Sequence, residues 1–224
     1  PQLSFGASSK TIKTRDTSKI RLGFIGVGRQ AMGLLGNFMK NPNVEVTAAA
    51  DVYAIKLERF QKRTLKHYED RGGLTGGIAL YSNYKDLLKS EEVDAVVIAS
   101  PDHWHALMAI DACKAGKDIY LEKPLTFTIK EGQELVKAVR SNGIVLGVGN
   151  MQRSGTNFQH AVRMVQKGYL GKIKTVYANV GTPPFPKEID FEAQTIPAGL
   201  DWKAWNGPIP AVPYFPDLNP PISI

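Results

Sequence analysis

The sequence predicts an α/β protein with a doubly wound, mostly parallel sheet. Strand-like and helix-like apolar patterns alternate with short breaks from residue 20 to about residue 150. The strand-like runs are apolar throughout, which is typical of strands that helices cover on both faces. The candidate binding residues all follow these runs, at the predicted carboxyl ends of strands, where doubly wound folds bind their ligands.

The predicted elements follow one another in a regular order. We expect strands at residues 20–25, 44–50, 93–99, 118–121 and 144–148, and helices at 30–40, 54–68, 84–89, 103–115 and 129–141. Gly116 and the pair Asn142-Gly143 stand where helix C-terminal caps are expected. The glycine-rich residues 72–77 contain no lysine, so they are interpreted as a surface loop and not as a phosphate loop.

Composition limits the function classes. The chain has 224 residues, of which 43% are hydrophobic, and no apolar run approaches the length of about 20 residues that spans a bilayer. Cys113 is the single cysteine, which excludes an internal disulfide. The net charge is +7, but the basic excess is concentrated before residue 30, and the rest has no basic face interleaved with aromatic residues. We therefore predict no nucleic-acid partner.

Residues 1–19 are predicted to form a flexible basic lead-in. Small residues followed by a polar stretch are compatible with the last part of an export signal, and equally with a disordered arm. The expected location is therefore cytoplasmic by default, with export to the periplasm as the alternative.

A glycine turn follows the first predicted strand. Residues 26–31 read GVGRQA, between the apolar run 20–25 and an apolar helix. Gly26 permits a tight turn, Gly28 leaves space for a pyrophosphate, and Ala31 is small enough for the helix to pack on the strand. Arg29 and Gln30 lie at the edge of this turn. The pattern predicts dinucleotide binding, because a helix N-terminus offers unpaired N–H groups to an anion.

Asp51 ends the second predicted strand, about 20 residues beyond the glycine turn. Its carboxylate is expected to accept hydrogen bonds from the adenosine ribose. A 2′-phosphate near this carboxylate would be repelled, so we expect NAD as the cofactor, with NADP less favoured.

Two further motifs follow predicted strands. In Glu122-Lys123-Pro124, Glu122 is expected to hold Lys123 beside a nicotinamide, where the ammonium donates hydrogen bonds; an ordinary ion pair at a strand end is the alternative. Residues 100–105 read SPDHWH, with Asp102 as the expected helix cap. The two histidines of this segment are two residues apart and do not share a helix face, so no metal site is predicted.

These motifs resemble those of the glucose–fructose oxidoreductase / inositol dehydrogenase (Gfo/Idh/MocA) family. The resemblance extends from about residue 20 to 215 and includes GNMQR at 149–153 and GLDWKAWNGPIP at 199–210. It implies a Rossmann domain at residues 20–150, followed by an α/β domain with an open sheet. It also implies NAD(P)-dependent hydride transfer at a sugar or polyol carbon.

The resemblance also implies roles for individual residues. Lys123 contacts cofactor and substrate and is expected to be catalytic with His105, while Arg153 reaches the substrate. The expected cofactor-binding residues are Gly26, Gly28, Arg29, Gln30, Ala31, Asp51, Ser100, Pro101, Trp104, Glu122 and Asn150. The family's second domain supplies a further catalytic histidine, for which this chain has no match. Two alternatives stay open: NAD-using glycoside cleavage with transient oxidation, and a catalytically silent nucleotide-binding module.

After residue 150 the pattern changes. A helix at 157–167 and an alternating strand at 173–180 precede a proline-rich stretch without a regular period. We expect residues 151–224 to be the start of an incomplete domain for substrate binding and oligomerisation. On this view Trp202, Trp205, Tyr214 and Phe215 would be exposed unless further chain covered them.

Overall fold

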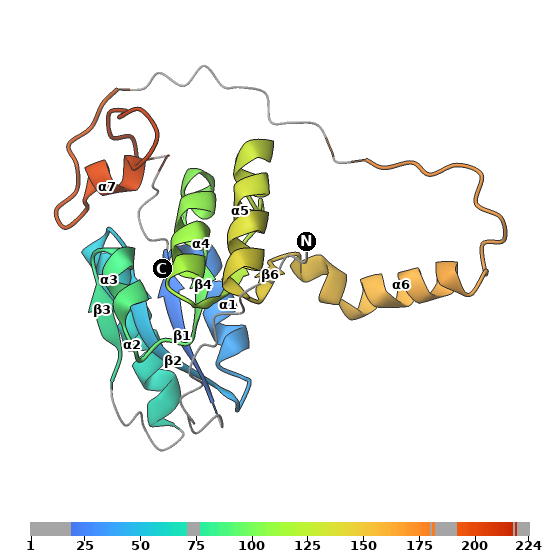
Figure 1. The fold of residues 1–224 in the computed structure, drawn as a ribbon, viewed down its shortest axis with the longest axis horizontal. Coiled ribbons are helices and arrows are strands. Elements are labelled where there is room, and N and C mark those ends of the chain that lie inside the picture. Colours follow the sequence, from blue (N-terminus) through green and yellow to red (C-terminus); the bar gives the residue numbers. More distant parts are fainter. Residues whose placement is uncertain (1–18, 71–76, 180, 182–191, 217, 219–224) are drawn as a thin grey trace, which may run out of the picture.

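The computed structural model describes residues 19–70, 77–179, 181, 192–216 and 218 (Figure 1). The strands are β1 (Ile20–Ile25), β2 (Val44–Ala50), β3 (Ala79–Tyr81), β4 (Ala95–Ile98), β5 (Asp118–Leu121) and β6 (Leu146–Val148). The helices are α1 (Arg29–Phe38), α2 (Ala54–Glu69), α3 (Tyr84–Lys89), α4 (His105–Lys114), α5 (Ile129–Asn142), α6 (Thr156–Gln166) and α7 (Trp202–Asn206). Two 3₁₀ turns, η1 (Asp102–Trp104) and η2 (Met151–Ser154), precede α4 and α6.

These strands form one parallel sheet in the order β3-β2-β1-β4-β5-β6. The chain builds outward from β1 in one direction as far as β3 and then returns to the other side of β1 with β4. This order is that of a doubly wound α/β fold whose topological switch point lies between β1 and β4. The predicted fold class is confirmed.

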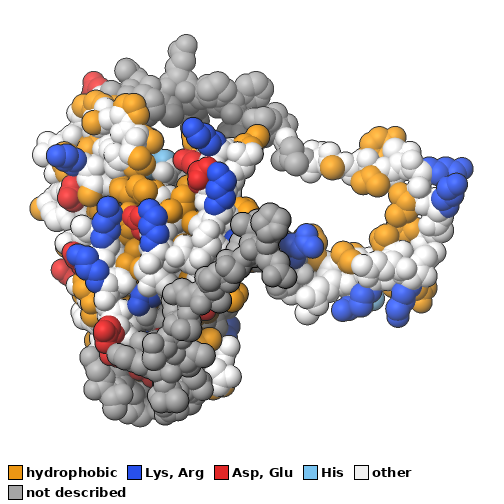
Figure 2. All heavy atoms as spheres, in the orientation of Figure 1, with side chains coloured by type: hydrophobic (Ala, Val, Ile, Leu, Met, Phe, Trp, Pro, Cys, Tyr) orange, Lys and Arg blue, Asp and Glu red, His pale blue; other side chains and the backbone are white. Residues whose placement is uncertain are grey.

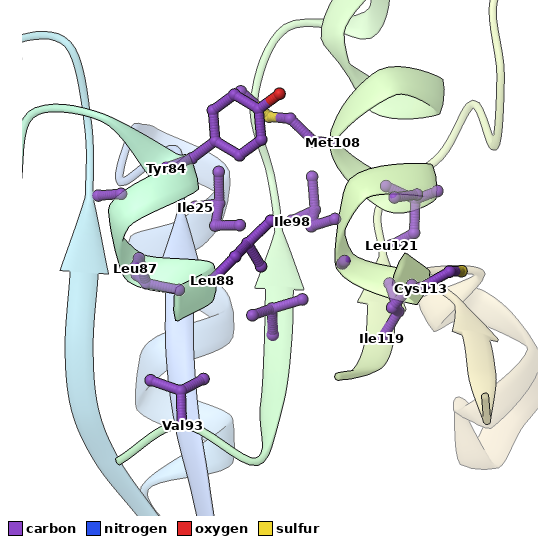
Figure 3. Packing of buried hydrophobic residues seen from close by; sticks show 14 of the residues in the cluster. Ile25, Tyr84, Leu87, Leu88, Val93, Ile98, Met108, Cys113, Ile119 and Leu121 are labelled. Carbon is purple, nitrogen blue, oxygen red and sulfur yellow. The ribbon is translucent and has the colours of Figure 1, made fainter. Parts of the chain in front are cut away.

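Helices cover both faces of the sheet, which explains why its central strands are apolar throughout. On one face, α1 and α2 pack over β1, where the rings of Phe24 and Phe60 lie 5.1 Å apart. On the other face, Leu87 of α3 and residues of α4 and α5 pack around Ile98 and Leu121 (Figure 3). Apolar side chains on both faces of the sheet are removed from water, and this burial stabilises the packing of helices on each face.

The helix ends follow local sequence signals. Thr128 and Glu131 form a reciprocal capping box at the start of α5, and Gly143 ends that helix at a φ of 62°. Gly116 follows α4 at a φ of 71°, as its predicted capping position requires. Asp102 does not cap α4, contrary to our expectation. It lies within η1, and no side chain caps either η1 or α4.

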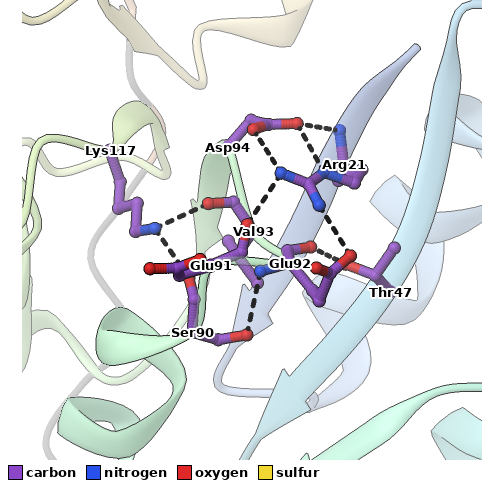
Figure 4. Close-up of polar contacts among 8 residues, drawn as sticks. All are labelled: Arg21, Thr47, Ser90, Glu91, Glu92, Val93, Asp94 and Lys117. Atoms are coloured by element: carbon purple, nitrogen blue, oxygen red, sulfur yellow. Dashed lines mark hydrogen bonds and ion pairs between the residues drawn. The ribbon is translucent and has the colours of Figure 1, made fainter. Parts of the chain in front are cut away.

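A charged network ties β1 to β4 at the amino edge of the sheet (Figure 4). The Arg21 guanidinium donates to Asp94 at 3.0 Å and to Glu92 at 2.6 Å, and hydrogen bonding to Asp94 raises the pKa of Arg21 above its usual value. Lys117 Nζ donates to the carbonyl oxygens of Ser90 and Val93 at 2.8 and 2.7 Å. These contacts hold the starts of β1 and β4 together at the amino edge of the sheet, opposite to the carboxyl edge.

Some expectations need correction. The short strand β3 was not predicted, and the expected strand at 173–180 is wrong for residues 173–179, which form no strand. The lead-in, apart from Lys19, and residues 72–76 of the glycine-rich loop lie outside the described residues.

Beyond β6 the chain first leaves the domain and then returns to it. Helix α6 projects away from the sheet (Figure 1), and hydrophobic side chains, among them Phe158 and Val162, are exposed along this extension (Figure 2). Residues 199–216 pack back onto the domain, where Trp202 and Tyr214 are each only 6% exposed. The expected exposure of these two residues was therefore wrong, because they pack on each other, on neighbours in the same segment, and on Val52 and Tyr53 of the sheet domain. Trp205 and Phe215 are half-buried. No helix in the described part of the chain has the length and apolar character needed to cross a membrane.

Candidate functional site

A cleft of about 660 Å³ lies at the carboxyl edge of the sheet. The turn from β1 to α1 and the residues after β2, β3 and β4 line it, and α7 supplies a further wall. The cleft therefore includes the switch point between β1 and β4, which is where open α/β sheets bind ligands.

The glycine turn has the geometry that the sequence indicated. Gly26 has a φ of 77°, and a Cβ on it would lie 2.7 Å from backbone atoms of Ser100. At Gly28, by contrast, a Cβ would meet nothing within 4 Å. Gly28 is the N-cap of α1 and has no side chain to satisfy the first N–H groups of the helix. The turn thus offers open space next to donors suited to an anion.

Asp51 lies beneath this turn. Its Oδ2 accepts from the Val27 N–H at 2.7 Å and its Oδ1 from the Tyr53 N–H at 3.0 Å. Burial raises the pKa of the Asp51 carboxyl above its ordinary value, against the opposing effects of the Lys56 charge and of these two hydrogen bonds. Lys56 also lines the cleft. The site therefore combines a buried carboxylate at the end of β2 with a neighbouring cation that the sequence did not single out.

The end of β4 forms the opposite side of the cleft. Ser100, Pro101 and Trp104 all line it, as expected for cofactor-binding residues. The Ser100 hydroxyl is buried and has no hydrogen-bond partner among the described residues. A buried polar atom without a partner is costly, so a ligand hydroxyl or phosphate at this position would satisfy it.

Glu122 connects the glycine turn to the end of β5. It is 3% exposed, and its carboxylate accepts from Gln30 Nε2 at 3.0 Å and from the Lys123 backbone N–H at 3.2 Å. A Cβ on Gly149, after β6, would lie 2.8 Å from this carboxylate. The expectation that Glu122 pairs with the Lys123 ammonium is corrected: Gln30 and the backbone occupy the carboxylate, and the Lys123 side chain is exposed.

His105 is buried, with 1% of its surface exposed. Its Nδ1 lies 2.6 Å from the Pro124 carbonyl oxygen and its Nε2 2.9 Å from that of Ser100. Both ring nitrogens therefore face backbone carbonyls and not the cleft. This geometry gives the ring a supporting position between the end of β4 and the Lys123 turn, instead of the catalytic one suggested by the sequence.

Of the remaining predicted site residues, Arg29 and Gln30 line the cleft and the others do not. Ala31 is fully buried behind the turn, as expected for helix–strand packing, while Asn150 and Arg153 are exposed after β6. Neither Asn150 nor Arg153 lines the cleft, and neither does Lys123. The cleft residues that were not predicted from the sequence are Ile25, Ala50, Val52, Lys56, Ser82, Asn83, Tyr84, Lys85, Ala99, Met108, Asp201, Ala204, Trp205 and Leu218.

A glycine turn between β1 and α1, a carboxylate after β2 and a cleft at the switch point together define a dinucleotide-binding α/β domain. The open space at Gly28 and the unsatisfied Ser100 hydroxyl fit such a ligand. The chain belongs to the Gfo/Idh/MocA family, whose model, described as an oxidoreductase family with an NAD-binding Rossmann fold, matches residues 20–150. The family that the sequence resembles is therefore confirmed.

Curated relatives extend well beyond this chain. It is 30% identical over 175 residues to the uncharacterised oxidoreductase YrbE of Bacillus subtilis, covering 78% of this chain and 48% of YrbE. It is 28% identical over 174 residues to an alpha-N-acetylgalactosaminidase of Shewanella oneidensis, covering 77% of this chain and 37% of that protein. The chain thus spans about half the length of these relatives or less.

Solved structures of similar proteins also extend well beyond this chain. Myo-inositol 2-dehydrogenase from Lactobacillus plantarum is 29% identical, with a TM-score of 0.61 over 69% of this chain and 43% of that one. A variant of KijD10, a 3-ketoreductase from Actinomadura kijaniata in complex with TDP-benzene and NADP, is 29% identical. Its TM-score is 0.60, over 70% of this chain and 46% of that one.

Proposed function

We propose that this chain is the cofactor-binding portion of an NAD(P)-dependent oxidoreductase that acts on a hydroxyl carbon of a sugar or polyol. The observation that carries the proposal is the cleft at the switch point, with its glycine turn and Asp51. The similarity to an inositol dehydrogenase and to a 3-ketoreductase supports the substrate class. In this proposal residues 151–224 begin the part that binds substrate and forms an oligomer.

The residues of the cleft bind and orient the cofactor. Gly28 and the N-terminus of α1 receive the pyrophosphate, and Asp51 accepts from the ribose hydroxyls. The bound nicotinamide supplies hydride transfer. We propose NAD as the preferred form because Asp51 would repel a 2′-phosphate, although Lys56 lines the same cleft and opposes this effect.

Lys123 is the proposed catalytic side chain. Its exposed ammonium follows β5, and its backbone is fixed by Glu122, so the three N–H donors can address a substrate hydroxyl. His105 fixes the same turn through the Pro124 carbonyl and thereby positions Lys123. Arg153 is proposed to reach the substrate, and Asn150 the cofactor.

A second candidate function is glycoside cleavage in which the sugar is transiently oxidised and then reduced. The observation that favours it is the similarity to an alpha-N-acetylgalactosaminidase and to proteins of glycosyl hydrolase family 109. This route uses the same cofactor cleft and yields no net reduced cofactor.

One experiment separates the candidates. The active enzyme that contains this portion is incubated with NAD and a panel of inositols, sugars and aryl glycosides, while reduced nicotinamide and released aglycone are followed together. Accumulation of reduced cofactor supports the dehydrogenase, and aglycone release without accumulation supports cleavage. Cofactor binding with neither product would refute both and leave a silent binding module.

A further inference from the structure

Residues 199–207, which contain α7 and which we call the clasp, lie against the cofactor cleft although they follow the predicted Rossmann domain. Their first anchor is the segment after β2. Leu200 forms an antiparallel bridge with Tyr53, the Ala54 N–H donates to the Gly199 carbonyl at 3.0 Å, and the Asp201 N–H donates to the Val52 carbonyl at 2.9 Å. The clasp is therefore hydrogen-bonded to the residues directly beside Asp51.

The second anchor is the segment after β4. Trp104 Nε1 donates to the Trp205 carbonyl at 2.9 Å, and His103 Nε2 lies 2.9 Å from the same oxygen. Gly207 packs so tightly on the Trp104 ring that the ring leaves no room for a Cβ at this position. Two anchors on different strand ends make the clasp a bridge from β2 to β4 across the cleft.

Aromatic packing and side-chain hydrogen bonds fix the conformation of the clasp. The rings of Trp202 and Trp205 stack at 4.4 Å with an interplanar angle of 13°, and Tyr214 meets Trp202 edge-on at 5.1 Å. Trp202 Nε1 donates to the Val212 carbonyl at 2.7 Å, and Asp201 caps α7 by accepting from the Ala204 N–H at 2.8 Å. These contacts fix the side chains that the clasp presents to the cleft.

Asp201, Ala204 and Trp205 line the same cleft as Asp51 and the residues after β3, whereas Lys123 does not. We propose that the clasp binds the adenosine half of the dinucleotide, with Trp205 as its main apolar contact. This inference rests on the proposed function, because it assumes that the cleft takes a dinucleotide. The proposal assigns cofactor binding to residues outside the Rossmann domain. The residues that bind the adenosine are then different from Lys123, the proposed catalytic residue.

The test uses ADP-ribose, which has the adenosine half without the nicotinamide, alongside NAD. Trp205→Ala removes the ring but keeps the backbone carbonyl that forms the second anchor. We expect it to weaken both ligands by the same factor of about 10, the scale on which bases depend on an aromatic contact. Lys203→Ala is the matched control, since this exposed side chain of α7 does not line the cleft. Calorimetric titration measures the affinities, and thermal unfolding checks each variant.

Ala204→Leu provides a second variant that removes no contact. Ala204 lines the cleft, so the larger side chain should occlude the adenosine and weaken both ligands even if Trp205→Ala loosens the clasp. If the wild-type protein binds ADP-ribose and both variants bind it equally well, the clasp is not a binding element, although the proposed function stands. If the wild-type protein binds neither ligand, the proposed function itself fails.

Discussion

Replacing Gly28 by alanine should abolish most cofactor affinity while leaving the fold intact. A Cβ at Gly28 would meet nothing within 4 Å, and the residue has a φ of −70°, which alanine adopts without strain. The free energy of unfolding should therefore change by no more than about 0.5 kcal/mol. The added methyl group would instead occupy the space in front of the α1 N-terminus, where the pyrophosphate is expected.

The size of the effect follows from the contacts that the methyl group would displace. A phosphate oxygen within hydrogen-bond distance of a backbone N–H at this turn cannot also keep van der Waals distance from the new carbon. A hydrogen bond to a charged group contributes about 1.5–3 kcal/mol. Losing one such bond raises the Kd about 10- to 150-fold.

Two other glycines make the experiment decisive. Gly33, an exposed residue of α1 whose Cβ would also meet nothing, should accept alanine with unchanged affinity and gain about 0.5–1 kcal/mol of stability. Gly26→Ala should destabilise the protein, because of its positive φ and the 2.7 Å approach to Ser100. NAD titration and thermal unfolding of all three variants give the answer. A Gly28→Ala protein with wild-type affinity for NAD would refute the assignment of the turn to the pyrophosphate.

Four further outcomes are expected. NAD should bind more tightly than NADP, because Asp51 repels a 2′-phosphate by roughly 4 kcal/mol at about 4 Å and an effective dielectric of about 20, before Lys56 offsets part of it; equal Kd values would contradict this. Burial raises the pKa of the Asp51 carboxyl, so on acidification this group should become protonated at a pH above the usual carboxyl range, and the preference for NAD over NADP should then decrease. In Asp51→Ala only the 2′-phosphate of NADP titrates, so the ratio of the two Kd values should change less with pH. Lys123→Ala should lower turnover of the active enzyme about 10²- to 10⁴-fold with an unchanged Tm. Normal turnover in this variant would show that Glu122-Lys123-Pro124 has only a structural role. Arg21→Ala should cost about 1–3 kcal/mol in denaturant unfolding and leave the Kd for NAD unchanged, since its network lies at the opposite edge; a changed Kd would contradict that separation.

The sequence predicts the fold and the cofactor turn well because both depend on local patterns. Apolar runs identify β1 and β2, and the glycine turn marks the end of β1 while Asp51 marks the end of β2. Since all strands are parallel, knowing where each one ends brings Gly28, Asp51 and Ser100 to one edge before any contact is known. The structure confirms this assembly, with all three residues lining one cleft.

Contacts between distant segments were not predictable in the same way. Strand β3 has only three residues and no distinctive period, so the residues after it were not recognised as lining the cleft. The anchors of the clasp are largely backbone hydrogen bonds, such as that from Asp201 to Val52, which any sequence can form. Glu122 beside Lys123 suggested an ion pair, but burial of the carboxylate favours the amide of Gln30, 92 residues away.

The hydrogen bonds around Glu122 and His105 show how this fold links its two halves. Gln30 lies in the first turn of α1, and its amide is bonded to the carboxylate that also fixes the Lys123 backbone. The His105 ring lies between the carbonyl oxygen of Pro124, in the same turn, and that of Ser100, at the other side of the cleft. Buried polar contacts, which are costly to break, therefore connect the glycine turn to the Lys123 turn. In the proposed enzyme these contacts fix the Lys123 backbone relative to the turn that holds the pyrophosphate, and the exposed Lys123 side chain extends from that fixed point.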